Sequence, residues 1–161
     1  MVVKTSILKD LENQYTQSGN QLCVLYGRED SEKEVLLKAL VQNKKFFYYR
    51  ARQVSAEEQV RQMGREIADR FEVSLQKYTY EEYFNRVKSG GPEKLIIIID
   101  EFQYIVKKDP AFMEAIGKLR AKRLYPGPVQ ILLCSSAVAW VEKELAGYIG
   151  EATGKAIDVK I

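Results

Sequence analysis

One run of residues constrains the fold of this chain more than any other: Lys94-Leu95-Ile96-Ile97-Ile98-Ile99-Asp100-Glu101. Four consecutive β-branched Ile residues disfavour a helix and suit a strand. Because polar and apolar residues do not alternate in this run, we expect a strand buried on both faces, inside a sheet rather than at its edge. The two carboxylates that follow it lie where ligands bind in open α/β sheets, at the carboxyl end of a strand.

The rest of the chain predicts strands that alternate with helices. Strand-like apolar runs occupy residues 21–26, 44–50, 129–134 and 156–161, and amphipathic helical patterns lie between them. Capping boxes begin at Ser55 and Thr79, and Asp109-Pro110 is a further helix start. This order predicts a three-layer α/β/α fold with a parallel sheet and right-handed crossovers, formed by one domain over residues 1–161.

The composition excludes several classes of site. The 161 residues are 46% hydrophobic and 29% charged, which is ordinary for a soluble globular domain. A net charge of +3 is too small to require a nucleic-acid or membrane partner. The chain has no histidine, which rules out a Ser-His-Asp or Cys-His site and removes the commonest metal ligand.

The two cysteines and the lack of long apolar runs indicate an intracellular protein. Cys23 and Cys134 lie far apart within apolar runs and outside any C-x-x-C pattern, so we expect buried, reduced thiols. No run approaches the roughly 18 apolar residues of a membrane span. The first residues lead into a charged amphipathic segment and not into a signal peptide. We therefore expect a cytoplasmic location and no membrane partner.

The apolar run that ends in Asp100-Glu101 is typical of a Walker B strand. In such a strand the Asp organises Mg²⁺ and the Glu polarises the attacking water. The alternative is a core strand that ends in two solvated acids. A Walker B pair requires a phosphate-binding loop after the first strand, with the pattern Gly, four residues, then Gly-Lys-Ser/Thr.

Residues 26–34 occupy the position of that loop, but they depart from the pattern. Gly27 and Lys33 keep their places, whereas Glu32 replaces the second Gly and Glu34 replaces the hydroxyl residue. The second Gly lets backbone amides approach phosphate, and the hydroxyl completes the Mg²⁺ shell. Residues 28–34 carry two cationic and four anionic side chains, a net of −2. We expect Glu32 and Glu34 to satisfy the helix N-terminus themselves, which predicts a degenerate phosphate site.

Taken together, these segments resemble the archaeal-type P-loop ATPases of the AAA/STAND group. The matching stretches are Leu25-Tyr26-Gly27-Arg28 with Lys33, Ile99-Asp100-Glu101-Phe102-Gln103-Tyr104-Ile105, and Leu133-Cys134-Ser135-Ser136. The resemblance implies a P-loop sheet with strand order 5-1-4-3-2. It also implies catalytic roles for Asp100 (metal), Glu101 (water) and Ser136 (sensor). ATP or ADP with Mg²⁺ would then be held through Gly27 and Lys33.

Three departures from the family pattern weaken the implied activity. Glu32 and Glu34 alter the phosphate loop, and Ser135 replaces the sensor Gly. In a loose alignment of residues 149–151, Glu151 stands where the family has a phosphate-stabilising Arg. The resemblance also implies a helical lid and an effector domain, which would follow about where this sequence stops, so we expect the core domain alone here.

The leading hypothesis is therefore an ATPase-like scaffold or interaction module whose partner is another protein. The alternative is an ATP-binding AAA/STAND-type ATPase with a variant phosphate loop. Contact with nucleic acid through the basic end of one helix is a third hypothesis, but no base-reading motif accompanies it, and helix dipoles favour solvated cations there. That helix end carries Lys118, Arg120, Lys122 and Arg123.

Two aromatic features also have two interpretations. Trp140 is either a packing residue or an anchor for a partner. Residues 46–49 are either a stacking platform or part of the sheet core, and we expect them in the core.

Ser135 and Ser136 are likewise either donors to a γ-phosphate or a simple helix cap after the strand.

Overall fold

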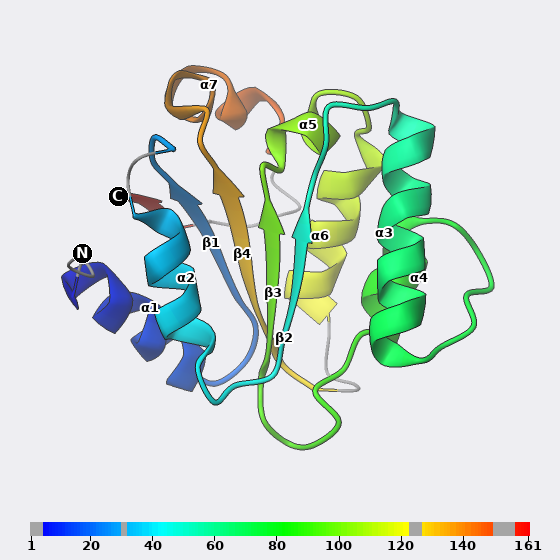
Figure 1. The fold of residues 1–161 in the computed structure, drawn as a ribbon, viewed down its shortest axis with the longest axis horizontal. Coiled ribbons are helices and arrows are strands. Elements are labelled where there is room, and N and C mark those ends of the chain that lie inside the picture. The colour runs from blue at the N-terminus through cyan, green and yellow to red at the C-terminus, as the bar shows by residue number, and fades with distance from the viewer. Residues whose placement is uncertain (1–4, 30–31, 123–126, 150–156) are drawn as a thin grey trace.

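The computed structural model describes residues 5–29, 32–122, 127–149 and 157–161, and it contains one all-parallel sheet (Figure 1). The strand order is β2-β3-β4-β1-β5, which is the predicted order 5-1-4-3-2 read from the other edge. The strands are β1 (Gln21–Tyr26), β2 (Phe46–Arg50), β3 (Leu95–Asp100), β4 (Val129–Ser135) and β5 (Ile157–Lys160).

The Ile run forms β3, and every residue of that strand is buried. Strands β2 and β4 pair with it on either side, so it lies inside the sheet as predicted. Ile97 and Ile99 enter the apolar core on one face, while Ile96 and Ile98 enter the core on the opposite face. Because both faces of this strand are buried, the side chains of Leu95–Ile99 are all apolar, which explains the absence of alternation in the sequence.

Helices cover both faces of the sheet and complete the three layers (Figure 1). The first face carries α1 (Thr5–Thr16) and α2 (Lys33–Val41). The second face carries α3 (Ala56–Phe71), α4 (Tyr80–Arg86) and α6 (Ala111–Lys122). The short elements that follow β3 and β4 are α5 (Gln103–Val106), α7 (Val138–Lys143) and a 3₁₀ turn at Leu145–Gly147.

The predicted helix starts are present. The hydroxyl of Ser55 accepts a hydrogen bond from Glu58 N at 3.1 Å, and the hydroxyl of Thr79 accepts one from Glu82 N at 3.2 Å. Both bonds satisfy an N–H group that the first turn of a helix leaves unpaired. The Asp109 carboxylate does the same for Ala111 N at 3.0 Å, just before α6.

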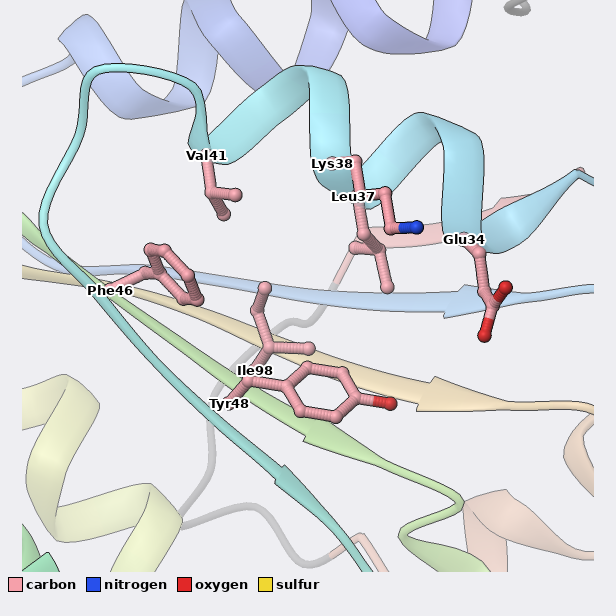
Figure 2. Close-up of a pocket in the computed structure, with 7 residues that line it drawn as sticks. All are labelled: Glu34, Leu37, Lys38, Val41, Phe46, Tyr48 and Ile98. Carbon is pink, nitrogen blue, oxygen red and sulfur yellow. The ribbon is translucent and has the colours of Figure 1, made fainter. Parts of the chain in front are cut away.

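Strand β2 is only half buried, which partly corrects the expectation that residues 46–49 belong to the core. Phe47 and Tyr49 are buried, but Phe46 and Tyr48 are 36% and 38% exposed. The reason is position, because β2 lies at an edge of the sheet. Figure 2 shows Phe46 and Tyr48 on the side of the sheet that faces α2.

The remaining expectations from composition concern cysteine and membranes. Cys23 and Cys134 are both buried and are not joined in a disulfide, as predicted. Across the ranges that the structure describes, every helix is too short or too polar to cross a membrane.

Candidate functional site

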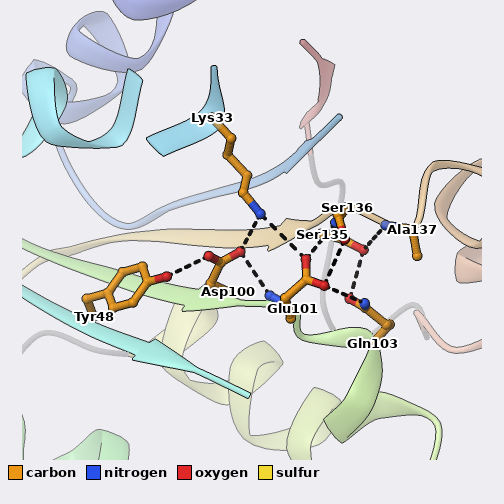
Figure 3. Close-up of polar contacts among 8 residues, drawn as sticks. All are labelled: Lys33, Tyr48, Asp100, Glu101, Gln103, Ser135, Ser136 and Ala137. Carbon is orange, nitrogen blue, oxygen red and sulfur yellow. Dashed lines mark hydrogen bonds and ion pairs between the residues drawn. The ribbon is translucent and has the colours of Figure 1, made fainter. Parts of the chain in front are cut away.

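Parallel strands place the predicted site residues at one end of the sheet. Asp100 is the last residue of β3, and Glu101 follows it. Ser136 follows β4, and Lys33 is the first residue of α2, after the loop that leaves β1. Since the carboxyl ends of parallel strands meet at one edge, residues far apart in the sequence come together there (Figure 3).

Lys33 is paired with both carboxylates. Its Nζ lies 2.7 Å from Asp100 Oδ1 and 3.5 Å from Glu101 Oε1, and all three side chains are buried. Burial acts to lower the pKa of Lys33, but the hydrogen bond and charge of Asp100, together with the charge of Glu101, outweigh it and raise that pKa. The ammonium is therefore held in its charged form by the two acids.

Tyr48 occupies the other oxygen of Asp100, and sequence reasoning missed this residue. The Tyr48 hydroxyl donates to Asp100 Oδ2 at 2.6 Å. Burial and the hydrogen bond to Asp100 raise the pKa of Tyr48 well above its ordinary value, so the phenol stays protonated as a donor. Tyr48 stands opposite Ile98 in the pairing of β2 with β3, which lets its hydroxyl reach the end of the neighbouring strand.

Glu101 adopts a left-handed backbone, with φ of 55°. This conformation is uncommon for a residue other than Gly, and it persists where the surroundings fix it. Ser136 donates twice to the Glu101 carboxylate, from its N at 2.7 Å and from its hydroxyl at 2.8 Å. Gln103 Nε2 donates to the same carboxylate at 3.1 Å. The structure therefore locks Glu101 in one orientation.

Ser135 helps to hold Gln103, a residue that donates to Glu101. Its hydroxyl donates to Gln103 Oε1 at 2.8 Å and accepts from Ala137 N at 3.0 Å. Ser135 therefore partly fits the alternative of a simple helix cap, because its hydroxyl accepts from a backbone N–H after β4. The Ser136 hydroxyl does not, because it donates to Glu101 (Figure 3). Gln103 belongs to the Asp-Glu-Phe-Gln-Tyr stretch, so that stretch was the signal that marked it.

The last residue of the loop after β1 has a backbone conformation that favours Gly. Glu32 immediately precedes α2 with φ 69° and ψ 18°, the left-handed conformation that Gly adopts most easily. Its side chain makes no capping hydrogen bond, so the prediction that Glu32 satisfies the helix N-terminus is wrong. Gly27 N donates to Ser135 O at 3.1 Å, which ties the start of the loop to β4. Residues 30 and 31 lie outside the described ranges.

A pocket of about 370 Å³ opens beside Lys33. Its lining carries more acidic than basic side chains, because four carboxylates face two cations. The lining residues are Glu29, Glu32, Lys33, Glu34, Val35, Arg50 and Asp100. Such a lining repels a polyphosphate, which needs cations and free amides.

The residues present fit a Mg²⁺-nucleotide poorly. Every oxygen of the Asp100 and Glu101 carboxylates accepts a hydrogen bond from a protein donor. The described part of the chain holds no group of three or more His, Cys, Asp or Glu side chains suited to a metal ion. Mg²⁺ in proteins is usually bound through one or two carboxylates together with phosphate oxygens, so both acids would first have to exchange partners.

Two sequence predictions fall partly outside the described residues. The stretch aligned with the family's Tyr-Gly-Arg segment includes residues 150 and 151, and the basic end of α6 includes residue 123. Within the described part of that helix, Lys118 forms exposed ion pairs with Glu81 at 3.3 Å. Trp140 is buried against Phe102, with ring centroids 5.5 Å apart, as a packing residue would be.

Comparison with known proteins gives few relatives by sequence. No protein-family model matches the chain. One curated relative, the uncharacterized protein MJECL04 of Methanocaldococcus jannaschii, is 23% identical over 148 residues. The match covers 92% of this chain but only 32% of the relative, so the chain spans about a third of that protein's length.

Solved structures give a clearer result. The Walker-type ATPase paby2304 of Pyrococcus abyssi superposes with a TM-score of 0.66 at 17% identity, over 99% of this chain and 53% of that one. The ORC1 protein of Aeropyrum pernix, solved with DNA, gives 0.64 at 15% identity, over 99% and 45%. The ORC2 protein of the same organism, solved as ADPNP–ADP complexes, gives 0.62 at 17% identity, over 100% and 48%.

The chain therefore has the P-loop NTPase-like fold, with the five-stranded parallel sheet described above. It spans about half the length of the solved structures that it resembles.

Proposed function

We propose that this domain is an ATPase-like scaffold that holds nucleotide weakly or not at all and acts mainly by binding another protein. One observation carries the proposal: the two carboxylates of the Walker B position have no free oxygen. Asp100 is bonded to Lys33 and Tyr48, and Glu101 is bonded to Ser136, Gln103 and Lys33.

Hydrolysis needs these acids in another state. An Asp that organises Mg²⁺ must face the metal shell, and a Glu that activates water must reach a proton of that water. Here Lys33, the residue that would hold phosphate, is paired with the carboxylates instead. Separating a buried ion pair leaves uncompensated charge and costs about 3–5 kcal/mol, which a nucleotide would have to supply.

The charge around the pocket supports the same proposal. Glu29, Glu32 and Glu34 line the space next to Lys33, while Arg50 is the only further cation in the lining. In an ordinary phosphate loop the helix N-terminus and the lysine attract the anion together. Here the acidic side chains oppose both.

The alternative function is ATP binding through a variant loop, and two observations favour it. Glu32 has the left-handed backbone that Gly adopts most easily, at the position where the phosphate-loop pattern has Gly. Lys33, Asp100, Glu101 and Ser136 lie together as the resemblance implies. In this alternative Lys33 leaves the acids when phosphate binds.

Calorimetric titration with Mg-ATP and Mg-ADP distinguishes the two functions. The scaffold proposal expects no micromolar binding by the unmodified protein. Micromolar binding that is lost in Lys33→Ala would overturn it, because that result requires a lysine that holds phosphate. Lys38→Ala, an exposed lysine on the same helix, is the matched control.

Phosphate release tests hydrolysis separately from binding. The scaffold proposal expects the same background rate for the unmodified protein and for Glu101→Gln. The alternative expects turnover that collapses in Glu101→Gln while nucleotide binding is retained. Glu57→Gln, which changes an exposed acid on α3, controls for the loss of one charge.

A further inference from the structure

The outer edge of β2 carries backbone groups that the sheet does not use. Strand β2 pairs with β3 alone. Lys45 O accepts from Ile96 N at 3.1 Å, and Ala51 N donates to Asp100 O at 2.8 Å, so the odd-numbered residues face β3. Because successive residues of a strand point their N–H and C=O groups to opposite sides, the groups of residues 46, 48 and 50 face outward.

The space on both sides of this edge is hollow. A groove of about 340 Å³ lies between α2 and the sheet, with Phe46, Tyr48 and Ile98 in its lining (Figure 2). A second hollow of about 380 Å³ lies on the α3 side and shares Phe46 and Tyr48 with the first. The two hollows therefore flank the edge strand, which leaves room for the side chains of one more strand.

The two hollows differ in chemistry. The α2 side is mostly apolar, since Leu37 and Val41 complete its lining with only Glu34 and Lys38 as charged residues. The α3 side contains the carboxylates of Glu66 and Asp69. Neither of these acids forms a salt bridge within the described ranges of the chain.

The one cation of the α3-side hollow is already engaged. Arg70 Nη2 donates to Phe46 O at 3.2 Å, and the guanidinium lies 5.1 Å from the Phe71 ring centroid. Among the residues that the structure describes, Glu66 accepts from the neutral Gln62, at 3.0 Å. With two carboxylates and one guanidinium in its lining, the hollow has a net charge of −1, which complements a basic ligand.

We propose that the β2 edge binds an extended segment of a partner protein as an added strand, with alternating apolar and basic side chains. The apolar side chains enter the α2-side groove, and Lys or Arg side chains approach Glu66 and Asp69. Alternation follows from the geometry, because successive side chains of a strand point to opposite faces. This inference rests on the proposed role as an interaction module and names the chemistry of its partner.

The charges that flank β2 disfavour a second copy of this chain at the same edge. Antiparallel pairing of two β2 strands about Tyr48 places Lys44 of one copy opposite Arg52 of the other. Like charges directly opposite each other destabilise a strand pair. A partner segment with apolar and basic residues in alternation avoids that conflict and balances the excess negative charge of the α3-side hollow.

The probe is a capped peptide of about seven residues, the usual length of a strand, in which Val and Lys alternate. We expect saturable binding by calorimetry and protection of the backbone amides of Tyr48 and Arg50 in hydrogen-exchange NMR. A peptide of alternating Val and Glu should bind about tenfold more weakly. Asp69→Lys should reverse that preference, whereas Asp10→Lys, the same charge change on the exposed side of α1, should preserve it.

Three results would overturn the inference. A control peptide has all its Val residues together and all its Lys residues together. If it binds as tightly as the alternating peptide, the edge does not recognise alternation. Binding without protection at Tyr48 and Arg50 would place the peptide elsewhere. Sedimentation that shows a dimer without peptide, with those amides protected, would assign the edge to a second copy.

The two proposals fail separately. If neither peptide nor nucleotide binds, the scaffold proposal stands and only the β2 edge is excluded as its docking surface. If Mg-ATP binds at micromolar concentration through Lys33, the scaffold proposal fails whatever the peptide does.

Discussion

Lys33 Nζ lies 2.7 Å from Asp100 Oδ1, and both side chains are buried. The lysine that the sequence predicts as a phosphate ligand is thus bonded to the acid that it predicts as a Mg²⁺ ligand. Such a pair is costly to desolvate, and its net value depends on further hydrogen bonds to each partner. Tyr48 and the backbone N of Glu101 provide those bonds to Asp100, so the pair is well satisfied.

Lys33→Met should lower the free energy of unfolding by about 3–5 kcal/mol, because it leaves two buried carboxylates without their cation. Adding Asp100→Asn should recover part of the loss, since one of the uncompensated charges is then removed. Urea unfolding measures both variants. Lys38→Met, at an exposed position of the same helix, should change stability by less than about 0.5 kcal/mol, and an equal loss there would contradict the argument.

Stability should fall at alkaline pH through Lys33 and Tyr48. Burial alone would lower the pKa of Lys33, but Asp100 outweighs burial and the pKa is raised. Burial and Asp100 both raise the pKa of Tyr48. The folded state therefore keeps these protons at a pH where the unfolded state has begun to lose them. The stability is fully present below about pH 10 and is lost as pH rises beyond it, by up to about 1.4 kcal/mol per pH unit for each group.

Tyr48→Phe isolates one part of that dependence. Urea unfolding between about pH 9 and 11 should show a shallower fall for this variant than for the unmodified protein, because one titration is removed. Tyr78→Phe changes a tyrosine that is 66% exposed and should keep the original slope. Identical slopes for all three proteins would mean that the Tyr48 hydroxyl does not hold Asp100.

Gly64→Ala should destabilise the contact between α3 and α4. A Cβ at Gly64 would lie 2.5 Å from the Tyr83 hydroxyl oxygen, and that hydroxyl donates to Val60 O at 2.7 Å. Since the buried ring must shift, we expect a loss of about 1–3 kcal/mol in urea unfolding. Gly147→Ala, where a Cβ meets nothing within 4 Å, is the control and should be close to neutral.

Glu32→Gly should raise the free energy of unfolding by about 1 kcal/mol, because Glu pays for a left-handed backbone that Gly adopts freely. Lys38→Gly should have the opposite sign and cost about 1 kcal/mol, since residue 38 lies inside helix α2. A loss of stability in Glu32→Gly would show that the Glu32 side chain makes a stabilising contact.

The fold was predictable where local patterns agree with the tertiary structure. The Ile run predicted a central strand because its residues are apolar on both faces, and β3 is such a strand. The Ser and Thr caps were predictable because they act within one helical turn. The exposure of Phe46 and Tyr48 was not, because it depends on which strand ends at the edge of the sheet.

The sequence predicted which residues form the candidate site better than it predicted the hydrogen bonds between them. Motif spacing pointed to Lys33, Asp100, Glu101 and Ser136, and the topology brings these residues together. Tyr48 was missed because its bond to Asp100 depends on the register between β2 and β3. The mistaken cap at Glu32 has a similar cause, since composition reveals the charge of a side chain but not its direction.

Tyr48 belongs to both surfaces described above, because its ring lines the groove at the sheet edge and its hydroxyl holds Asp100. Because the Tyr48 ring is rigid, a ligand that contacts the ring in the groove also restricts the hydroxyl that bonds to Asp100. Thermodynamic linkage then requires reciprocity: whatever a strand at the edge does to the affinity of the acids for a ligand, that ligand does to the affinity for the strand. One phenol thus connects the proposed strand-binding edge of the sheet to the carboxylate at the end of β3.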